Sequence, residues 1–417
     1  MSKFCRLYMV QSMGDICELN LNWVLPPMVR KYKTKPLEYL SYVIGAEGRG
    51  SLIAHLRKHR LALFLTAEVE DGGICSNSIY TIFTICISLT EEGRQDIKDI
   101  ITRVFCYLKM LRTNDASEDV YNELREIADT NFRFNHDARP VEHVTAISQN
   151  MTIFPPEDYL TGWALFYEFS PQDIESYVSK LIPSRANILL HMKNHDVELD
   201  KEERWFKTKY RSDEIPKEWI REWEEVDVLP DFSLPRSNPY LPTTFRILSQ
   251  ISSSVIPEKI AETELYEVWH KGCTKEFKIP YASVNILINI PKVSQSAENT
   301  VQQMLFSKMI TYQLIDDLYY AHVAQIEVLI SSVEYGMEIA IYGFSEKMPK
   351  IMKTLAEGLA AFKSKQRATT YVGVLENSSP KKHEEHDYCR KQAVGGYKEE
   401  CPDQFYVHEW RKNLRDR

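Results

Sequence analysis

Ser41-Tyr-Val-Ile-Gly-Ala-Glu-Gly-Arg-Gly-Ser-Leu52 is the stretch that decides the fold around it. An apolar run with helical spacing ends at Ile44, and the glycines Gly45, Gly48 and Gly50 follow at once. Glycine lets the backbone turn sharply or approach a ligand closely. Ser51 then stands where an N-cap would begin a second helix. The pattern predicts two helices joined by a hinge that exposes backbone donors and acceptors, with a plain helix-to-helix turn as the alternative.

Strand and helix patterns surround this stretch. Alternating apolar residues predict a strand over 14–24, and a segment rich in isoleucine, threonine and aromatic residues predicts another over 77–89. Thr90 is placed to cap one long helix, whose apolar residues keep helical spacing to Leu111. The other elements of this first half are expected at 116–132 (helix), 171–181 (helix) and 184–192 (strand).

The second half begins with a change of composition. Residues 196–243 are rich in charge, tryptophan and proline, which indicates a structured inter-domain linker, because proline interrupts regular elements while the aromatic residues imply packing. The elements beyond it have an α+β order and are expected at 264–271 and 281–290 (strands), 298–323 (helix), 325–334 and 337–344 (hairpin) and 347–363 (helix). The polar residues 366–417 are predicted to be poorly ordered.

Composition narrows the class of protein. A chain of 417 residues that is 44% hydrophobic and 26% charged is typical of a soluble protein with two domains and extensions. A net charge of -8 argues against nucleic acid as a partner. No apolar run is long enough to span a membrane, and the first residues lack the apolar region of a signal peptide. Scattered cysteines without framework spacing then predict reduced thiols and a cytoplasmic location.

The sequence contains no common catalytic or metal-binding motif. It has no Gly-x-Ser-x-Gly elbow, and the glycine-rich stretch lacks the Lys-Ser/Thr of a phosphate loop. His55 and His59 lie one helical turn apart without an acid between them, so we interpret them as surface histidines. Four potential zinc ligands near the C-terminus have spacings that fit a zinc finger poorly. These four are His383, His386, Cys389 and Cys401.

Taken together, the motifs resemble nardilysin-like members of the pitrilysin (insulinase, inverzincin) family of zinc metallopeptidases. The resemblance rests on the glycine-rich stretch and on scattered matches between about residues 7 and 365. These matches are Leu19-Asn-Leu-Asn-Trp-Val-Leu-Pro-Pro27, Ser51-Leu-Ile-Ala-His-Leu-Arg-Lys58, Ser88-Leu-Thr-Glu-Glu-Gly93, Val104-Phe-Cys-Tyr-Leu-Lys-Met-Leu111, Thr161-Gly162, Trp205-Phe-Lys-Thr-Lys-Tyr210 and Phe277-Lys-Ile-Pro280. The resemblance implies an α+β fold of two α/β sandwich units, each an antiparallel-rich sheet with helices on one face.

The resemblance also implies a division into domains. We expect the second, exosite-bearing family domain at 1–195, a linker at 196–243, an incomplete third domain at 244–365 and a divergent tail at 366–417. The first domain, with the zinc motif, would precede Met1, and the fourth would follow Arg417. In the motif H-x-x-E-H two histidines bind zinc and the glutamate activates water, but none of the eleven histidines here stands in that pattern. We therefore expect no cofactor on this chain, although zinc is the family's cofactor.

A substrate-anchoring exosite is the site that the resemblance implies. In the family the stretch reads His-Glu-Gly-x-Gly-Ser-Leu and pairs with an edge strand carrying Gly-Gly, onto which a peptide adds as an extra strand. Here Ala46 replaces the histidine and Ala67-Glu68 replaces the glycine pair. Side chains there would crowd the peptide, and Glu68 would favour positively charged peptides. The candidate exosite residues are Ala46, Glu47, Gly48, Arg49, Gly50, Ser51, Leu52, Leu65, Thr66, Ala67 and Glu68.

The expected function is binding of peptides or of a complementary peptidase chain by a homologue without peptidase activity of its own. One alternative is a segment of an active zinc metalloendopeptidase that cleaves at basic sites, encoded by a split gene or an incomplete gene model. Another is a structural remnant whose uncovered apolar faces associate. Neither nucleic acid nor a membrane span is expected.

Overall fold

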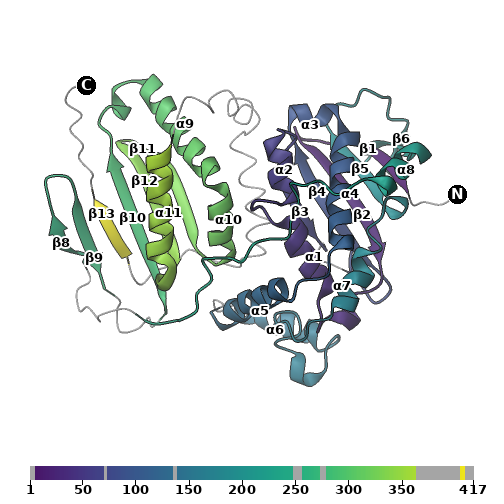
Figure 1. Ribbon diagram of the computed structural model, residues 1–417, viewed down its shortest axis with the longest axis horizontal. Coiled ribbons are helices and arrows are strands. Elements are labelled where there is room, and N and C mark those ends of the chain that lie inside the picture. The colour runs from purple at the N-terminus through teal and green to yellow at the C-terminus, as the bar shows by residue number, and fades with distance from the viewer. Residues whose placement is uncertain are drawn as a thin grey trace. The chain divides into compact units, whose positions relative to one another are not determined.

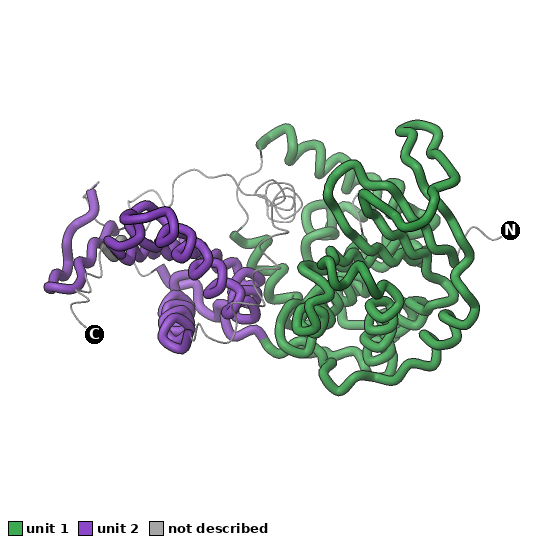
Figure 2. Tube along the Cα trace, turned by 90° about the horizontal axis from the view of Figure 1, so that it is seen from above, with its two compact units in different colours: residues 1–237 green, residues 238–417 purple. Residues whose placement is uncertain are grey.

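The computed structural model describes residues 5–69, 73–134, 139–247, 256–272, 279–362 and 404–408. The chain divides into two compact units, 1–237 and 238–417 (Figure 2). Both units combine a largely antiparallel sheet with helices, so the predicted α+β class is confirmed. The domain bounds that the family resemblance implies stay a prediction.

The sheet of unit 1 has seven strands in the order β3-β4-β2-β5-β1-β7-β6 (Figure 1). Its strands are β1 (Arg6–Gln11), β2 (Cys17–Leu25), β3 (Ala62–Glu68), β4 (Thr81–Leu89), β5 (Asn187–Met192), β6 (Lys201–Glu202) and β7 (Lys209–Glu214). Neighbouring strands are antiparallel except β1 and β5, which run parallel. Strand β3 therefore lies at one edge of this sheet.

Unit 1 also contains helices, of which α1 and α2 pack on β3 and α3 packs on β4. They are α1 (Pro36–Gly45), α2 (Leu52–Lys58), α3 (Glu91–Gln95), α4 (Ile97–Thr113), α5 (Glu118–Arg133), α6 (Pro140–Asn150), α7 (Pro171–Val178) and α8 (Lys217–Glu225). Leu19, Leu21 and Trp23 alternate along β2 and are fully buried, as a strand with one covered face requires. The ring of Trp23 packs edge-on against Phe105 of α4, with 6.3 Å between the ring centres.

One prediction for this unit needs correction. The single helix expected after Thr90 is two helices, because Asp96 leaves the helical conformation (φ -136°, ψ 68°) and its side chain caps α4 by accepting from the Asp99 N–H. Residues 196–237, which the expected structured linker includes, contain β6, β7 and α8, and β7 pairs with β1. The proline-rich composition reflects the irregular segments between these elements. It does not exclude the elements themselves.

Unit 2 contains a six-stranded sheet in the order β11-β12-β10-β13-β9-β8. Its elements are β8 (Glu258–Glu262), β9 (Glu267–Lys271), β10 (Tyr281–Asn289), α9 (Ala297–Gln313), α10 (Ile315–Val323), β11 (Glu327–Val333), β12 (Gly336–Phe344), α11 (Met348–Ala361) and β13 (Gln404–His408). Short 3-10 turns in the chain span Val29–Lys31, Pro156–Asp158, Pro183–Arg185, Val293–Gln295 and Ser345–Lys347. The helix expected over 298–323 is interrupted at Leu314, and β8 was not predicted.

The polar tail is mostly outside the described residues. Within 366–417 only Gln404–His408 is described, and it forms β13 between β10 and β9. The prediction of poor order for the rest of the tail, and the four potential zinc ligands His383, His386, Cys389 and Cys401, lie outside the described residues.

The Glu346 carboxylate links the first residues of unit 2 to the end of its sheet by hydrogen bonds. Glu346 accepts hydrogen bonds from the backbone N–H groups and the hydroxyls of Thr243 and Thr244, and it lies 3.0 Å from the Lys347 ammonium. Burial raises the pKa of Glu346, but the hydrogen bonds from Thr244, Lys347 and Thr243 outweigh burial and lower it to about 2. The charged carboxylate therefore stabilises the folded state.

Replacing Glu346 by glutamine should lower the free energy of unfolding of unit 2 by about 2 kcal/mol at pH 7. Because the pKa is lower in the folded chain, the contribution is complete above about pH 4.3, the usual pKa of the unfolded glutamate, and is lost as the pH falls towards 2. Denaturant unfolding of both proteins between pH 7 and 3 measures this difference. Glu357→Gln, at an exposed site of α11, is the matched control; equal losses for the two variants would contradict the prediction.

Candidate functional site

The hinge after α1 has the predicted form. Helix α1 ends at Gly45, Ala46 turns to an extended conformation (φ -58°, ψ 140°), and α2 begins at Leu52. The Ser51 side chain caps α2 by accepting from the Ala54 N–H at 3.2 Å, which confirms the predicted N-cap. Gly50 has φ +88°, a conformation that favours glycine. The hinge between two helices is therefore confirmed.

The hinge exposes less backbone than the sequence suggested. The carbonyl of Gly48 accepts from the Ser51 N–H at 3.1 Å, and the carbonyl of Gly50 accepts from the Ser233 N–H at 3.0 Å. Both carbonyls are therefore engaged within unit 1. Of the hinge residues, Ala46, Gly48, Ser51 and Leu52 are buried, whereas Arg49 is exposed.

The structure brings the hinge and the predicted edge strand together. Helices α1 and α2 both pack on β3, and a side chain at Gly45 would lie 3.8 Å from the Ala67 backbone nitrogen. On β3, Leu65 and Ala67 point into the core, while Thr66 and Glu68 are exposed. Strand β3 pairs with β4, and no described strand lies along its other side. Of Ala67 and Glu68, which stand where the family has two glycines, only Glu68 has an exposed side chain.

Arg57 connects the three parts of this site. Its Nε donates to the Leu63 carbonyl of β3 at 2.9 Å, and its Nη1 lies 2.7 Å from Oε2 of Glu47 in the hinge. The contact with Glu47 has the distance of a hydrogen bond without its alignment, so it acts as a close ion pair. Both side chains are mostly buried, which strengthens the attraction between them. Sequence reasoning missed Arg57; the only available signal was an arginine on the apolar side of a short helix.

His55 corrects another prediction. We expected a surface histidine, but its side chain is buried with only 7% of the residue exposed, while His59 is exposed. The ring of His55 packs against Phe232 at 5.0 Å between ring centres, and its Nε2 lies 2.5 Å from Nη1 of Arg103. The segment around Phe232 covers this part of α2, which a pattern confined to α2 did not reveal.

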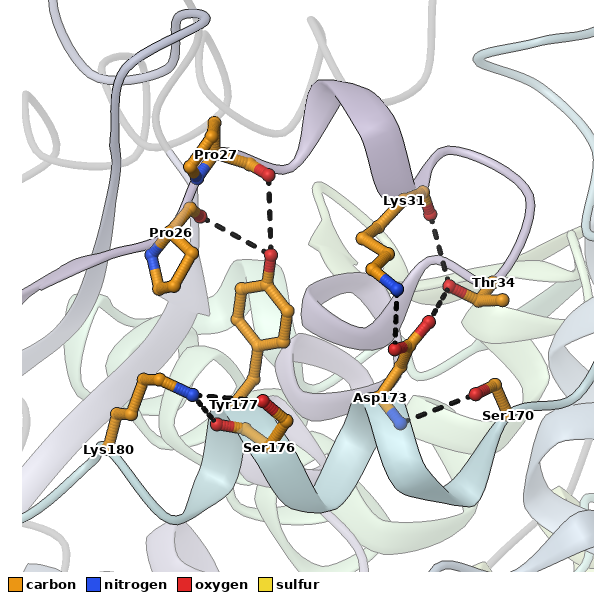
Figure 3. Close-up of polar contacts among 9 residues, drawn as sticks. All are labelled: Pro26, Pro27, Lys31, Thr34, Ser170, Asp173, Ser176, Tyr177 and Lys180. Carbon is orange, nitrogen blue, oxygen red and sulfur yellow. Dashed lines mark hydrogen bonds and ion pairs between the residues drawn. The ribbon is translucent and has the colours of Figure 1, made fainter.

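Polar contacts hold the segment that leads from β2 into α1 (Figure 3). Asp173 of α7 accepts from the Lys31 ammonium at 2.7 Å and from the Thr34 hydroxyl at 2.8 Å. Burial raises the pKa of Asp173, but these hydrogen bonds outweigh burial and lower it. The Tyr177 hydroxyl donates towards the Pro26 carbonyl at 3.3 Å and the Pro27 carbonyl at 3.4 Å. These contacts place α1, and with it the hinge, against α7.

The side chains at the site do not fit a metal ion. Nε2 of His55 faces the guanidinium of Arg103, a cation that would repel a metal ion at that nitrogen. Among the described residues no group of three or more His, Cys, Asp or Glu side chains is placed to hold one. The described cysteines, Cys5, Cys17, Cys75, Cys86 and Cys106, form no disulfide with one another. No helix in the described ranges is long and apolar enough to cross a membrane.

Comparisons with known proteins agree on one family. Residues 4–127 match the family description "Peptidase M16 inactive domain", and residues 132–379 match "Middle or third domain of peptidase_M16". Nardilysin of Mus musculus is 34% identical over 371 residues, which cover 88% of this chain and 32% of that protein. Insulin-degrading enzyme of Homo sapiens is 29% identical over 358 residues, covering 86% of this chain and 35% of that protein.

A solved structure shows the same fold. The crystal structure of pitrilysin superimposes with a TM-score of 0.74 at 19% identity, covering 98% of this chain and 46% of that one. The present chain spans about a third of the length of the curated relatives it matches.

Proposed function

The chain belongs to the M16 family of peptidases, and on this premise we propose that it is a nardilysin-like member that is non-catalytic alone and binds extended peptides along β3. One observation carries the proposal: β3 is the edge of its sheet and lies directly against the hinge. A peptide that adds to an edge strand is held by backbone hydrogen bonds, so such a site accepts many sequences. The chain has no H-x-x-E-H motif with which to hydrolyse the bound peptide.

Alternating N-methylation of a peptide tests strand addition directly. An added strand pairs with β3 through every second residue, so methyl groups on those nitrogens should abolish binding. Methyl groups on the other set of nitrogens should be tolerated, and the two peptides thus serve as each other's control. Equal affinities for both would contradict binding along β3. Chelator-sensitive cleavage of a fluorogenic dibasic peptide by the pure chain would contradict the non-catalytic assignment.

Replacing Glu68 by lysine should reverse the charge preference of the site. The Glu68 side chain is exposed at the end of β3, where a peptide added along that strand would pass, whereas Glu47 is mostly buried beside Arg57. An exposed pair contributes up to about 1 kcal/mol, so affinity for a dibasic peptide should fall about fivefold, and an acidic peptide should gain. Fluorescence anisotropy at low salt measures both.

Glu92→Lys is the charge-matched control for this experiment, because Glu92 is exposed on α3 and lies outside the proposed site. If Glu92→Lys weakens the dibasic peptide as much as Glu68→Lys does, the effect comes from net charge and the assignment of Glu68 is wrong.

A second candidate function is docking onto a complementary M16 peptidase chain, in which this chain forms a segment of an active zinc metalloendopeptidase. Helix α6 favours it, because none of its residues is buried and Val141 and Val144 expose apolar side chains one turn apart. Trp163 is also exposed. Large exposed apolar patches are typical of protein interfaces.

Mixing the chain with a separately expressed M16 domain that carries H-x-x-E-H tests this candidate. Chelator-sensitive peptide cleavage that appears on mixing, and that is weakened by Val144→Glu, would support it. Cleavage that does not depend on this chain would exclude it.

A further inference from the structure

The neighbours of His55 require an uncharged imidazole. Nη1 of Arg103 lies 2.5 Å from Nε2 of His55, within hydrogen-bond distance. An arginine guanidinium carries donors only and keeps its proton in proteins, so Nε2 must be the acceptor. The ring proton then resides on Nδ1, which faces Oδ2 of Asp231 at 3.5 Å. A second ring proton would place two donors, and two positive charges, against each other.

A segment that we call the strap, residues 229–234, covers His55 and the hinge. Phe232 is buried between the rings of His55 and Tyr107, with 5.0 and 5.1 Å between ring centres. The next residue, Ser233, donates its N–H to the Gly50 carbonyl at 3.0 Å. The strap thus joins the histidine to the glycine that turns the hinge.

Charged groups from each neighbouring element act on His55. Helix α2 contributes Lys58 and His59, helix α4 contributes Arg103 with its partner Asp99, and the strap contributes Asp231. Asp231 attracts a charged imidazole, but it also lies 2.9 Å from the Lys58 ammonium and is half exposed. Burial, then Arg103 and His59, lower the pKa of His55, and Asp231 only partly opposes them. The closed strap therefore excludes a proton that the open strap accepts.

We propose that His55 is a pH sensor, and that its protonation opens the strap and releases the hinge at Gly50. Once the strap lifts, water reaches the imidazole, solvates its charged form and screens the repulsion from Arg103, which stays in place on α4. Opening then takes up one proton, so the equilibrium constant for opening rises up to tenfold per pH unit below about pH 6.5, the usual pKa of histidine.

A consequence for peptide binding rests on the proposed function. The open strap no longer holds Gly50 and no longer packs Phe232 against α2, the helix that carries Arg57. Because Arg57 binds the Leu63 carbonyl of β3, a loosened α2 leaves the edge strand less well placed. Peptide affinity at β3 is therefore expected to fall with acidification in parallel with strap opening.

Hydrogen–deuterium exchange of the strap tests the sensor without any peptide. After correction for intrinsic exchange rates, protection of the 229–234 amides should fall up to tenfold per pH unit between pH 6.5 and 5. His55→Gln keeps an acceptor for Arg103 but cannot gain a charge, so its protection should stay constant. If that variant does not fold, Arg103→Gln provides the second test, because without the guanidinium the pH dependence should become markedly weaker.

His191 on β5 provides the matched control. Burial also lowers the pKa of this histidine, but it lies on another element, so His191→Gln should leave the pH dependence of the strap intact. Protection of the wild-type strap that is independent of pH, or an unchanged dependence in His55→Gln, overturns the sensor. A peptide assay over the same pH range separates the two proposals: strap opening without peptide binding at any pH refutes the proposed function alone.

Discussion

Replacing Arg57 by alanine should lower the free energy of unfolding of unit 1 by about 3 kcal/mol, because removing one member of a buried ion pair leaves the other charge without its partner. The variant also loses the hydrogen bond to the Leu63 carbonyl, and with it the tie between α2 and β3. Denaturant unfolding followed by tryptophan fluorescence measures the stability. Arg57→Lys should recover only part of the loss, because a single ammonium cannot reach Glu47 and Leu63 with the same geometry.

Arg49→Ala is the matched control, since it removes an arginine from the same hinge but from an exposed position. It should change the stability by less than about 0.5 kcal/mol. A double-mutant cycle of Arg57→Met with Glu47→Gln then isolates the pair itself. A coupling energy near zero would show that the guanidinium acts through packing alone, and the role assigned to Glu47 would be wrong.

The hinge was predictable from sequence because its causes are local. Three closely spaced glycines and a serine at the N-cap act through backbone conformation and one hydrogen bond between near neighbours. Strand β4 was likewise indicated by its isoleucine, threonine and aromatic content, and the helix that runs to Leu111 by the helical spacing of its apolar residues. Such features require no knowledge of what lies across the fold.

Arg57 and His55 were not predictable for the opposite reason. Arg57 becomes a connecting residue only because β3 brings the Leu63 carbonyl beside it, and His55 is buried only because Phe232, far along the chain, covers it. Their environments depend on contacts between distant segments, and a pattern within one helix does not contain them. The break at Asp96 has a local cause that the apolar period concealed: its side chain caps α4 by accepting from the Asp99 N–H, three residues along the chain.

The candidate site shows a similar division. The resemblance implied the candidate residues, and in the structure the hinge lies beside the edge strand. Yet many of the candidate residues, Ala46 and Leu65 among them, are buried and support the site from beneath. Thr66 and Glu68 are exposed on β3, so contacts specific to a peptide's side chains are concentrated there.

Replacing Gly50 by valine should also cost about 3 kcal/mol, through two separate effects. The backbone at Gly50 has φ +88°, which is strained for any L residue and most for a β-branched one. A Cβ there would also lie only 2.1 Å from the Ser233 Oγ and 3.3 Å from its Cβ. Both effects disfavour the contact between the hinge and the strap. The temperature of thermal unfolding should therefore fall, and the hydrogen-exchange rate of the strap amides should rise even at neutral pH.

Companion variants separate strain from collision at Gly50. Gly50→Ala should lose less stability than the valine variant, and adding Ser233→Gly should recover the part due to the collision but not the part due to φ. Gly73→Ala is the control, because a side chain there meets nothing within 4 Å. If Ser233→Gly recovers all of the loss, the backbone at position 50 adapts freely and its positive φ is not what holds the hinge. If it recovers none, the Ser233 side chain turns away without cost and the whole loss comes from the backbone conformation at position 50.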